Sequence, residues 1–125
     1  MSTLRCTNLQ DTSGGNSLTT AQIYNGAAKA WVNFNGTGTV AIRASYNVSS
    51  ITDNGVGDYT VNFTTAMADA NYSFNLNATR STLASAGDSI SFVNTTPTTS
   101  ALRISTTTGT GTLGDALFTT VSIFR

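Results

Sequence analysis

The sequence predicts an all-β fold, an antiparallel β-sandwich of jelly-roll-like form, and three observations predict it. Strong helix formers are nearly absent, because the chain has no Glu and Lys29 is its one Lys. Segments of strand length with alternating apolar and polar residues follow one another from residue 30 onwards. Turn residues separate these segments at short intervals, as in sandwiches and barrels. The 125 residues give room for one such domain.

Residues 1–28 are small and polar, and we predict that they form an extended N-terminal arm for attachment or for contact between subunits. The arm is expected to contain at most one short strand, near 21–24, and its clearest break is Gly14-Gly15-Asn16. Residues 29–125 are then expected to form the β-sandwich domain. Cys6 lies in the arm and is the one cysteine, so the chain cannot form an intrachain disulfide.

The first two strands are predicted over 30–34 and 40–48, on either side of Asn35-Gly36, a dipeptide typical of hairpins. Alternation in the first strand separates two pairs of side chains, Trp31 with Asn33 and Val32 with Phe34. In the second strand, one face carries Val40, Ile42, Ala44, Tyr46 and Val48, and the other carries Arg43, Ser45 and Asn47.

The clearest pair of strands is predicted over 58–64 and 72–78, because both segments alternate strictly. The apolar side chains expected to point inward are Tyr59, Val61, Phe63, Tyr72, Phe74, Leu76 and Ala78. The residues between them are Thr, Asn and Ser, as in antiparallel strands with one buried face. The connection 65–71 is short enough to join neighbouring strands.

Weaker strands are predicted over 89–93 and 101–105, and a last strand over 117–124. The last strand has apolar residues on both faces, Leu117, Val121 and Ile123 on one and Phe118 and Phe124 on the other. Such a strand is expected inside a stack of layers or against another subunit. Charged residues make up 10% of the chain and the net charge is zero, which also favours self-association. A monomeric sandwich with a Thr/Asn coat is the alternative.

Several functional classes are excluded by residues that the chain lacks. Without His there is no Ser-His-Asp triad or imidazole base, and one Cys cannot form the usual zinc site. Four of the six Asp lie beside turn glycines or asparagines, where their side chains bond the backbone. The segment 109–114 matches G-x-G-x-x-G, but no helical pattern follows it. We therefore expect a protein that is no enzyme, with no cofactor and no metal.

The charge pattern also limits the partners. Six scattered Lys and Arg against six Asp give no basic patch for nucleic acid. No apolar run approaches the roughly 20 residues that a membrane-spanning helix needs, so no membrane insertion is expected. The outward faces of the best strands carry uncharged hydroxyl and amide groups, which suit sugar hydroxyls. Such threonines also simply favour exposed strand positions. The loops 80–88 and 106–115 supply the candidate ligand-binding residues, Arg80, Asp88, Thr108 and Asp115.

Residues 28–74, AKAWVNFNGTGTVAIRASYNVSSITDNGVGDYTVNFTTAMADANYSF, resemble a module of tail-fibre and related virion-surface proteins of marine and cyanobacterial phages. The segments LRCTNLQDTSGGN and IYNGAAKAW and the closing strand at 121–124 resemble it too. The resemblance implies a non-enzymatic antiparallel β domain that forms a homotrimer at the virion surface and binds host-surface glycans such as lipopolysaccharide, or decorates the virion. The matching aromatic positions are interpreted as core: Trp31, Phe34, Tyr59, Phe63, Tyr72 and Phe74.

Three hypotheses remain from the sequence. The first is a receptor-binding or fibre-tip subunit, a homotrimer that recognises cell-surface polysaccharide. The second is a capsid-decorating or head-fibre protein that contacts other virion proteins through its N-terminal arm. The family module usually ends a much longer fibre, whereas here Met1 starts about 28 residues upstream of it, which favours a knob subunit or a decorating protein over a long shaft. The third is a free, monomeric carbohydrate-binding module, which requires exposed aromatic side chains.

Overall fold

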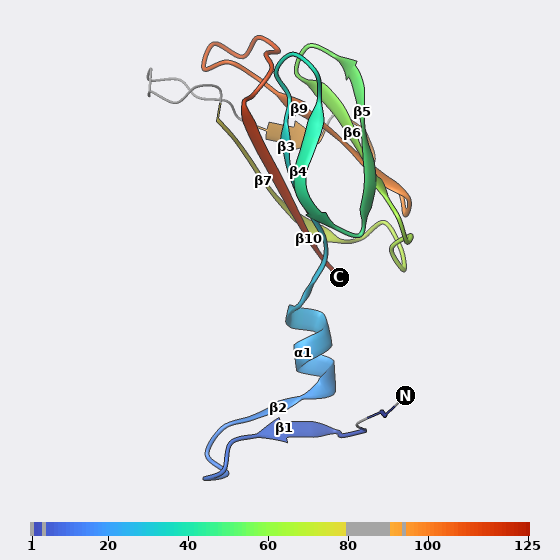
Figure 1. Ribbon diagram of the computed structural model, residues 1–125, viewed down its shortest axis with the longest axis vertical. Helices are drawn as coiled ribbons and strands as arrows, with labels where there is room; N and C mark the ends of the chain where they lie inside the picture. Colours follow the sequence, from blue (N-terminus) through green and yellow to red (C-terminus); the bar gives the residue numbers. More distant parts are fainter. Residues whose placement is uncertain (1, 4, 80–90, 94) are drawn as a thin grey trace.

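In the computed structural model (Figure 1), a small N-terminal arm leads into two antiparallel sheets, and the described residues are 2–3, 5–79, 91–93 and 95–125. The arm contains the paired strands β1 (Asn8–Gln10) and β2 (Ser17–Thr19), followed at once by helix α1 (Thr20–Gly26). The prediction of an extended arm with a strand near 21–24 is therefore wrong.

A capping box explains why the chain turns helical after β2. The Thr19 Oγ1 accepts a hydrogen bond from Gln22 N at 3.1 Å, and Thr19 N donates to Gln22 Oε1 at 2.8 Å. This reciprocal pair satisfies two of the backbone groups that a helix start leaves open. Thr19 itself keeps an extended conformation, with φ −73° and ψ 154°, and so joins strand to helix.

The first large sheet has the strand order β4-β3-β10-β7. Its strands are β3 (Ala28–Asn35), β4 (Ala41–Tyr46), β7 (Ser73–Thr79) and β10 (Phe118–Phe124). Strands β3, β7 and β10 lie where the alternation predicts them. The predicted strand 40–48 instead divides at Asn47, whose φ of 54° ends β4 and sends the chain to the other sheet.

The second large sheet has the order β5-β6-β9-β8. Its strands are β5 (Val48–Gly55), β6 (Asp58–Phe63), β8 (Ser91–Val93) and β9 (Ala101–Thr106). The sequence predicts no strand over 49–57, because the polar residues of β5 give no alternating signal and Asp53-Asn54-Gly55 is typical of a turn. Most of β5 was therefore missed. In the structure residues 53–55 pair with β6, and the turn itself is at residues 56–57.

One hydrophobic core receives side chains from both large sheets. The Phe34 ring on β3 meets the Tyr59 ring on β6 edge to face, with centroids 5.2 Å apart. Phe63 at the end of β6 meets Tyr72, just before β7, at 5.9 Å. These contacts bury large rings between the sheets and add the attraction of edge-to-face aromatic pairs.

The connection 65–71 does not join neighbouring strands, because it leads from β6 in one sheet to β7 in the other. The prediction from its length is wrong. Met67 lies in the connection and is buried in the core, and its backbone N donates to Thr99 O at 2.8 Å. The buried Met67 side chain thus holds the connection against the core where the chain passes from one sheet to the other.

Candidate functional site

The outer face of the β4-β3-β10-β7 sheet carries three exposed aromatic side chains. Trp31 is 40% exposed, Tyr46 59% and Phe118 42%. We call this surface the aromatic–amide face. Its members are Trp31, Asn33, Arg43, Tyr46, Asn75, Asn77, Phe118, Thr120 and Ser122.

The strand register arranges these side chains in rows across the sheet. One row runs from Tyr46 through Trp31 and Ser122 to Asn75, since each residue is the direct partner of the next. Residues directly opposite each other in an antiparallel sheet share a face. This row therefore places two neighbouring aromatic rings beside a hydroxyl and an amide.

The next row contains Asn33, Thr120 and Asn77, again as direct partners on β3, β10 and β7. Beyond it, Phe118 pairs with Thr79 on β7. Trp31, through its partner Ser122, and Phe118 thus lie on the two sides of this polar row, four residues or ~13 Å apart along the strands. Between the two ends, the face offers neutral donors and acceptors.

Trp31 is not a core residue, and the interpretation of it as core is wrong. Val32 and Phe34, its neighbours in the alternating pattern, are the buried ones, with 2% and 0% exposure. Alternation separates Trp31 and Asn33 from Val32 and Phe34, but it does not say which pair points inward. The signal for the outward face was Asn33, because a buried amide needs partners that an outward one finds in water.

Arg43 lies on this same face through a β-bulge. Asn33 pairs with Ala44, whereas Phe34 pairs with Ile42, so Arg43 is the extra residue. A bulge re-aims a side chain. The Arg43 guanidinium lies 4.3 Å from the centre of the Phe118 ring, and its Nη1 is 3.5 Å from Asn33 Oδ1. The alternating pattern predicts that Arg43 and Tyr46 lie on different faces of the strand, and this prediction is wrong.

Two of the four predicted ligand-binding residues, Thr108 and Asp115, lie in the loop before β10 and not on this face. Arg80 and Asp88 lie outside the described residues. The Thr108 hydroxyl is hydrogen-bonded within its own loop. Its Oγ1 lies 2.7 Å from Thr110 Oγ1 and accepts a hydrogen bond from Thr112 N at 3.2 Å. Their contact with a ligand stays a prediction.

Asp115 connects the loop before β10 to β6 and to the turn that precedes β6. Its Oδ1 accepts hydrogen bonds from Tyr59 Oη at 2.7 Å and from Gly57 N at 2.8 Å. Burial, and then the bond to the Asp115 carboxylate, raise the pKa of Tyr59 well above its usual value. The carboxylate therefore has a structural task, the attachment of its loop to β6 and the preceding turn.

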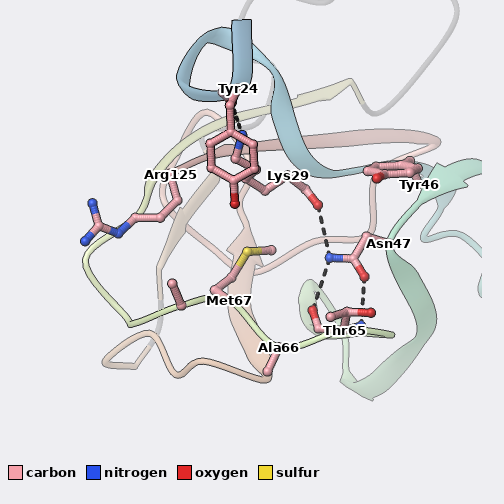
Figure 2. A pocket seen from close by; sticks show the side chains of 9 residues that line it. Tyr24, Lys29, Tyr46, Asn47, Thr65, Ala66, Met67 and Arg125 are labelled. Carbon is pink, nitrogen blue, oxygen red and sulfur yellow. Dashed lines mark hydrogen bonds between the residues drawn. The ribbon is translucent and has the colours of Figure 1, made fainter. Parts of the chain in front are cut away.

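A cleft of about 280 Å³ lies between the arm and the domain (Figure 2). Its polar groups bond mainly to one another. Lys29 Nζ donates to Tyr24 O and, at 3.2 Å, to Ala27 O, and lies 3.6 Å from the centre of the Tyr24 ring. The Asn47 amide donates to Lys29 O and Thr65 O, and accepts from Thr65 N at 2.7 Å. At this cleft Lys29, at the start of β3, therefore bonds to the end of helix α1, and Asn47 bonds β3 to the connection after β6.

Within the described residues, no group of three potential metal-ligating side chains comes together, and no helix is long and apolar enough to cross a membrane. Comparison with family models, curated proteins and solved structures finds no match for this chain. The aromatic–amide face is the candidate functional site of the chain.

Proposed function

We propose that this protein is a non-enzymatic virion-surface protein, a receptor-binding or fibre-tip subunit of a phage, that recognises host-surface glycan through its aromatic–amide face. The observation that carries the proposal is the combination on that face of exposed rings with uncharged amides and hydroxyls. Aromatic rings offer flat apolar surfaces to the C–H faces of sugars, and amides and hydroxyls both donate to and accept from sugar hydroxyls. The resemblance of residues 28–74 to virion-surface modules supports the setting.

The proposal includes a two-layer β-sandwich that assembles as a homotrimer. The two sheets of four strands support the sandwich. In support of the jelly-roll-like form, the chain passes from one large sheet to the other at four connections, β4–β5, β6–β7, β7–β8 and β9–β10. Light scattering on a size-exclusion column tests the assembly. A mass near three times 13.0 kDa supports the trimer, and a clean monomer favours a free carbohydrate-binding module.

Two tyrosine variants test the glycan site. Tyr46 lies on the aromatic–amide face, is 59% exposed and also borders the cleft, whereas Tyr24 borders the cleft from helix α1 and is 66% exposed. We expect Tyr46→Ala to weaken binding to bacterial surface polysaccharides on an array about tenfold, and Tyr24→Ala to leave it unchanged. An equal loss of polysaccharide binding in both variants would show that the glycan binds in the cleft and not on the aromatic–amide face. Binding of the wild-type protein to no polysaccharide on the array would overturn the function.

One observation favours a second function, a capsid-decorating or head-fibre protein anchored through the arm. The arm exposes Leu9, Leu18, Ile23 and Tyr24, and helix α1 buries none of its residues. Exposed apolar side chains on so small a unit are typical of an attachment site. Labelled antibody on intact particles separates the two functions, because label on heads supports the second and label on tail tips supports the first.

A further inference from the structure

The cations of the β domain have different partners in the structure. Arg103 forms a bidentate pair with Asp58, at 2.9 and 2.6 Å, on the second large sheet. Arg125 forms a bidentate pair with Asp69, and Lys29 Nζ bonds to backbone carbonyls at the end of α1. Among the described domain residues, Arg43 is the cation that has neither a carboxylate nor a carbonyl of the backbone as partner.

Arg43 is nevertheless held in place. Phe118 lies under its guanidinium at 4.3 Å, and Asn33 Oδ1 is at the edge of hydrogen-bond distance from Nη1. A guanidinium has five N–H donors in a fixed fork, and one long contact uses one of them. The β-bulge and the Phe118 ring therefore present a positioned fork of free donors in the polar part of the aromatic–amide face.

The described carboxylates lie elsewhere. Asp11 is in the arm, Asp53 and Asp58 are on the second large sheet, and Asp69 and Asp115 are bound by Arg125 and Tyr59. The aromatic–amide face, as far as the structure describes it, thus has a positive charge from Arg43 and no negative charge.

Building on the proposed glycan function, we propose that the recognised polysaccharide is anionic and that Arg43 binds its carboxylate or sulfate groups. The planar fork of arginine matches such oxygens in bidentate geometry, and hydrogen bonds between charged groups are shorter and stronger than neutral ones. Trp31 and Tyr46 then hold the sugar rings, and Arg43 selects the charged repeat.

Three polymers test this inference: neutral dextran, polygalacturonate for carboxylate, and dextran sulfate for sulfate. Binding is followed by the fluorescence of Trp31, the one tryptophan of the chain, at about 20 and 200 mM salt. We expect one anionic polymer to bind about tenfold more tightly than dextran, and the higher salt to reduce this preference. The preferred polymer tells carboxylate from sulfate.

The variant Arg43→Gln keeps hydrogen-bonding capacity but removes the charge, and should bring the anionic polymer within about twofold of dextran. Arg5→Gln in the arm removes the same charge away from the face and should leave the preference intact. Equal affinity of the wild-type protein for dextran and both anionic polymers, or equal effects of the two variants, would overturn the inference while glycan recognition stands. The polysaccharide array above is the separate test of glycan recognition itself.

Discussion

Removal of the Tyr59 hydroxyl group tests the hydrogen bond that attaches the Asp115 loop to the core. Tyr59 is fully buried, and its Oη lies 2.7 Å from Asp115 Oδ1 and 3.0 Å from Gly36 O. A hydrogen bond to a charged group contributes about 1.5–3 kcal/mol. The variant Tyr59→Phe keeps the ring and its packing against Phe34, so no large cavity adds to the cost. We therefore expect the free energy of unfolding to fall by about 1.5–3 kcal/mol.

The same variant has a signature in alkaline solution. Burial and the Asp115 carboxylate raise the pKa of Tyr59 in the folded protein above the value of about 10 that an unfolded chain has. The stability that this shift contributes is complete below pH 10 and falls as the pH rises above it, because the unfolded chain then loses the proton more readily. Tyr59→Phe should flatten this decline. Burial also raises the pKa of Tyr72, so part of the decline remains.

Urea unfolding at about pH 7 and pH 10.5 measures both effects. Tyr72→Phe is the matched control, because the Tyr72 hydroxyl donates to a neutral acceptor, Thr98 O, at 3.0 Å. A neutral hydrogen bond contributes about 0.5–1.5 kcal/mol, so this variant should lose less stability than Tyr59→Phe. A loss in Tyr59→Phe no greater than that in Tyr72→Phe would refute the assigned role of the Asp115 carboxylate.

Two further predictions concern backbone positions. Gly57 has φ +65°, and an added Cβ would lie 2.4 Å from Thr106 O, whereas Gly38 has φ +63° and open space around it. In thermal unfolding, Gly57→Ala should prevent folding or lower the midpoint far more than Gly38→Ala, which costs about 1–2 kcal/mol of backbone strain; similar midpoints would contradict the tight packing. At Asn47, with φ 54°, Asn47→Ala should be about 1–2 kcal/mol less stable in urea than Asn47→Gly, and the reverse order would show that its backbone is unstrained.

Strict alternation of apolar and polar residues correctly located two strands. The segments 58–64 and 72–78 became β6 and β7 within one residue at each end, and their apolar residues point inward. Alternation specifies which side chains share a face, because the side-chain period of a strand is two. It does not specify which strands are neighbours, and β6 and β7 indeed belong to different sheets.

The missed features have physical reasons of two kinds. Helix α1 follows from a local signal, the T-x-x-Q pattern of Thr19 and Gln22, which was present in the sequence and outweighed by the polar composition of the arm. The outward position of Trp31 and the bulge at Arg43 follow instead from the register between β3, β4 and β10. Register depends on contacts between distant segments, so the aromatic–amide face could not be assembled from one strand at a time.

The proposed glycan site and the proposed trimer also constrain each other. Within one chain, β10 is buried on one face only, and its other face, with Phe118 and Thr120, belongs to the aromatic–amide face. A subunit packed there would cover the aromatic rings of the proposed glycan site. The arm offers the other apolar surface, and its seven-residue helix is shorter than the roughly 12–15 residues that an isolated helix needs in water. Contacts between subunits through the arm would therefore leave the proposed binding face open, and Lys29 Nζ bonds to Ala27 O where the arm joins the domain.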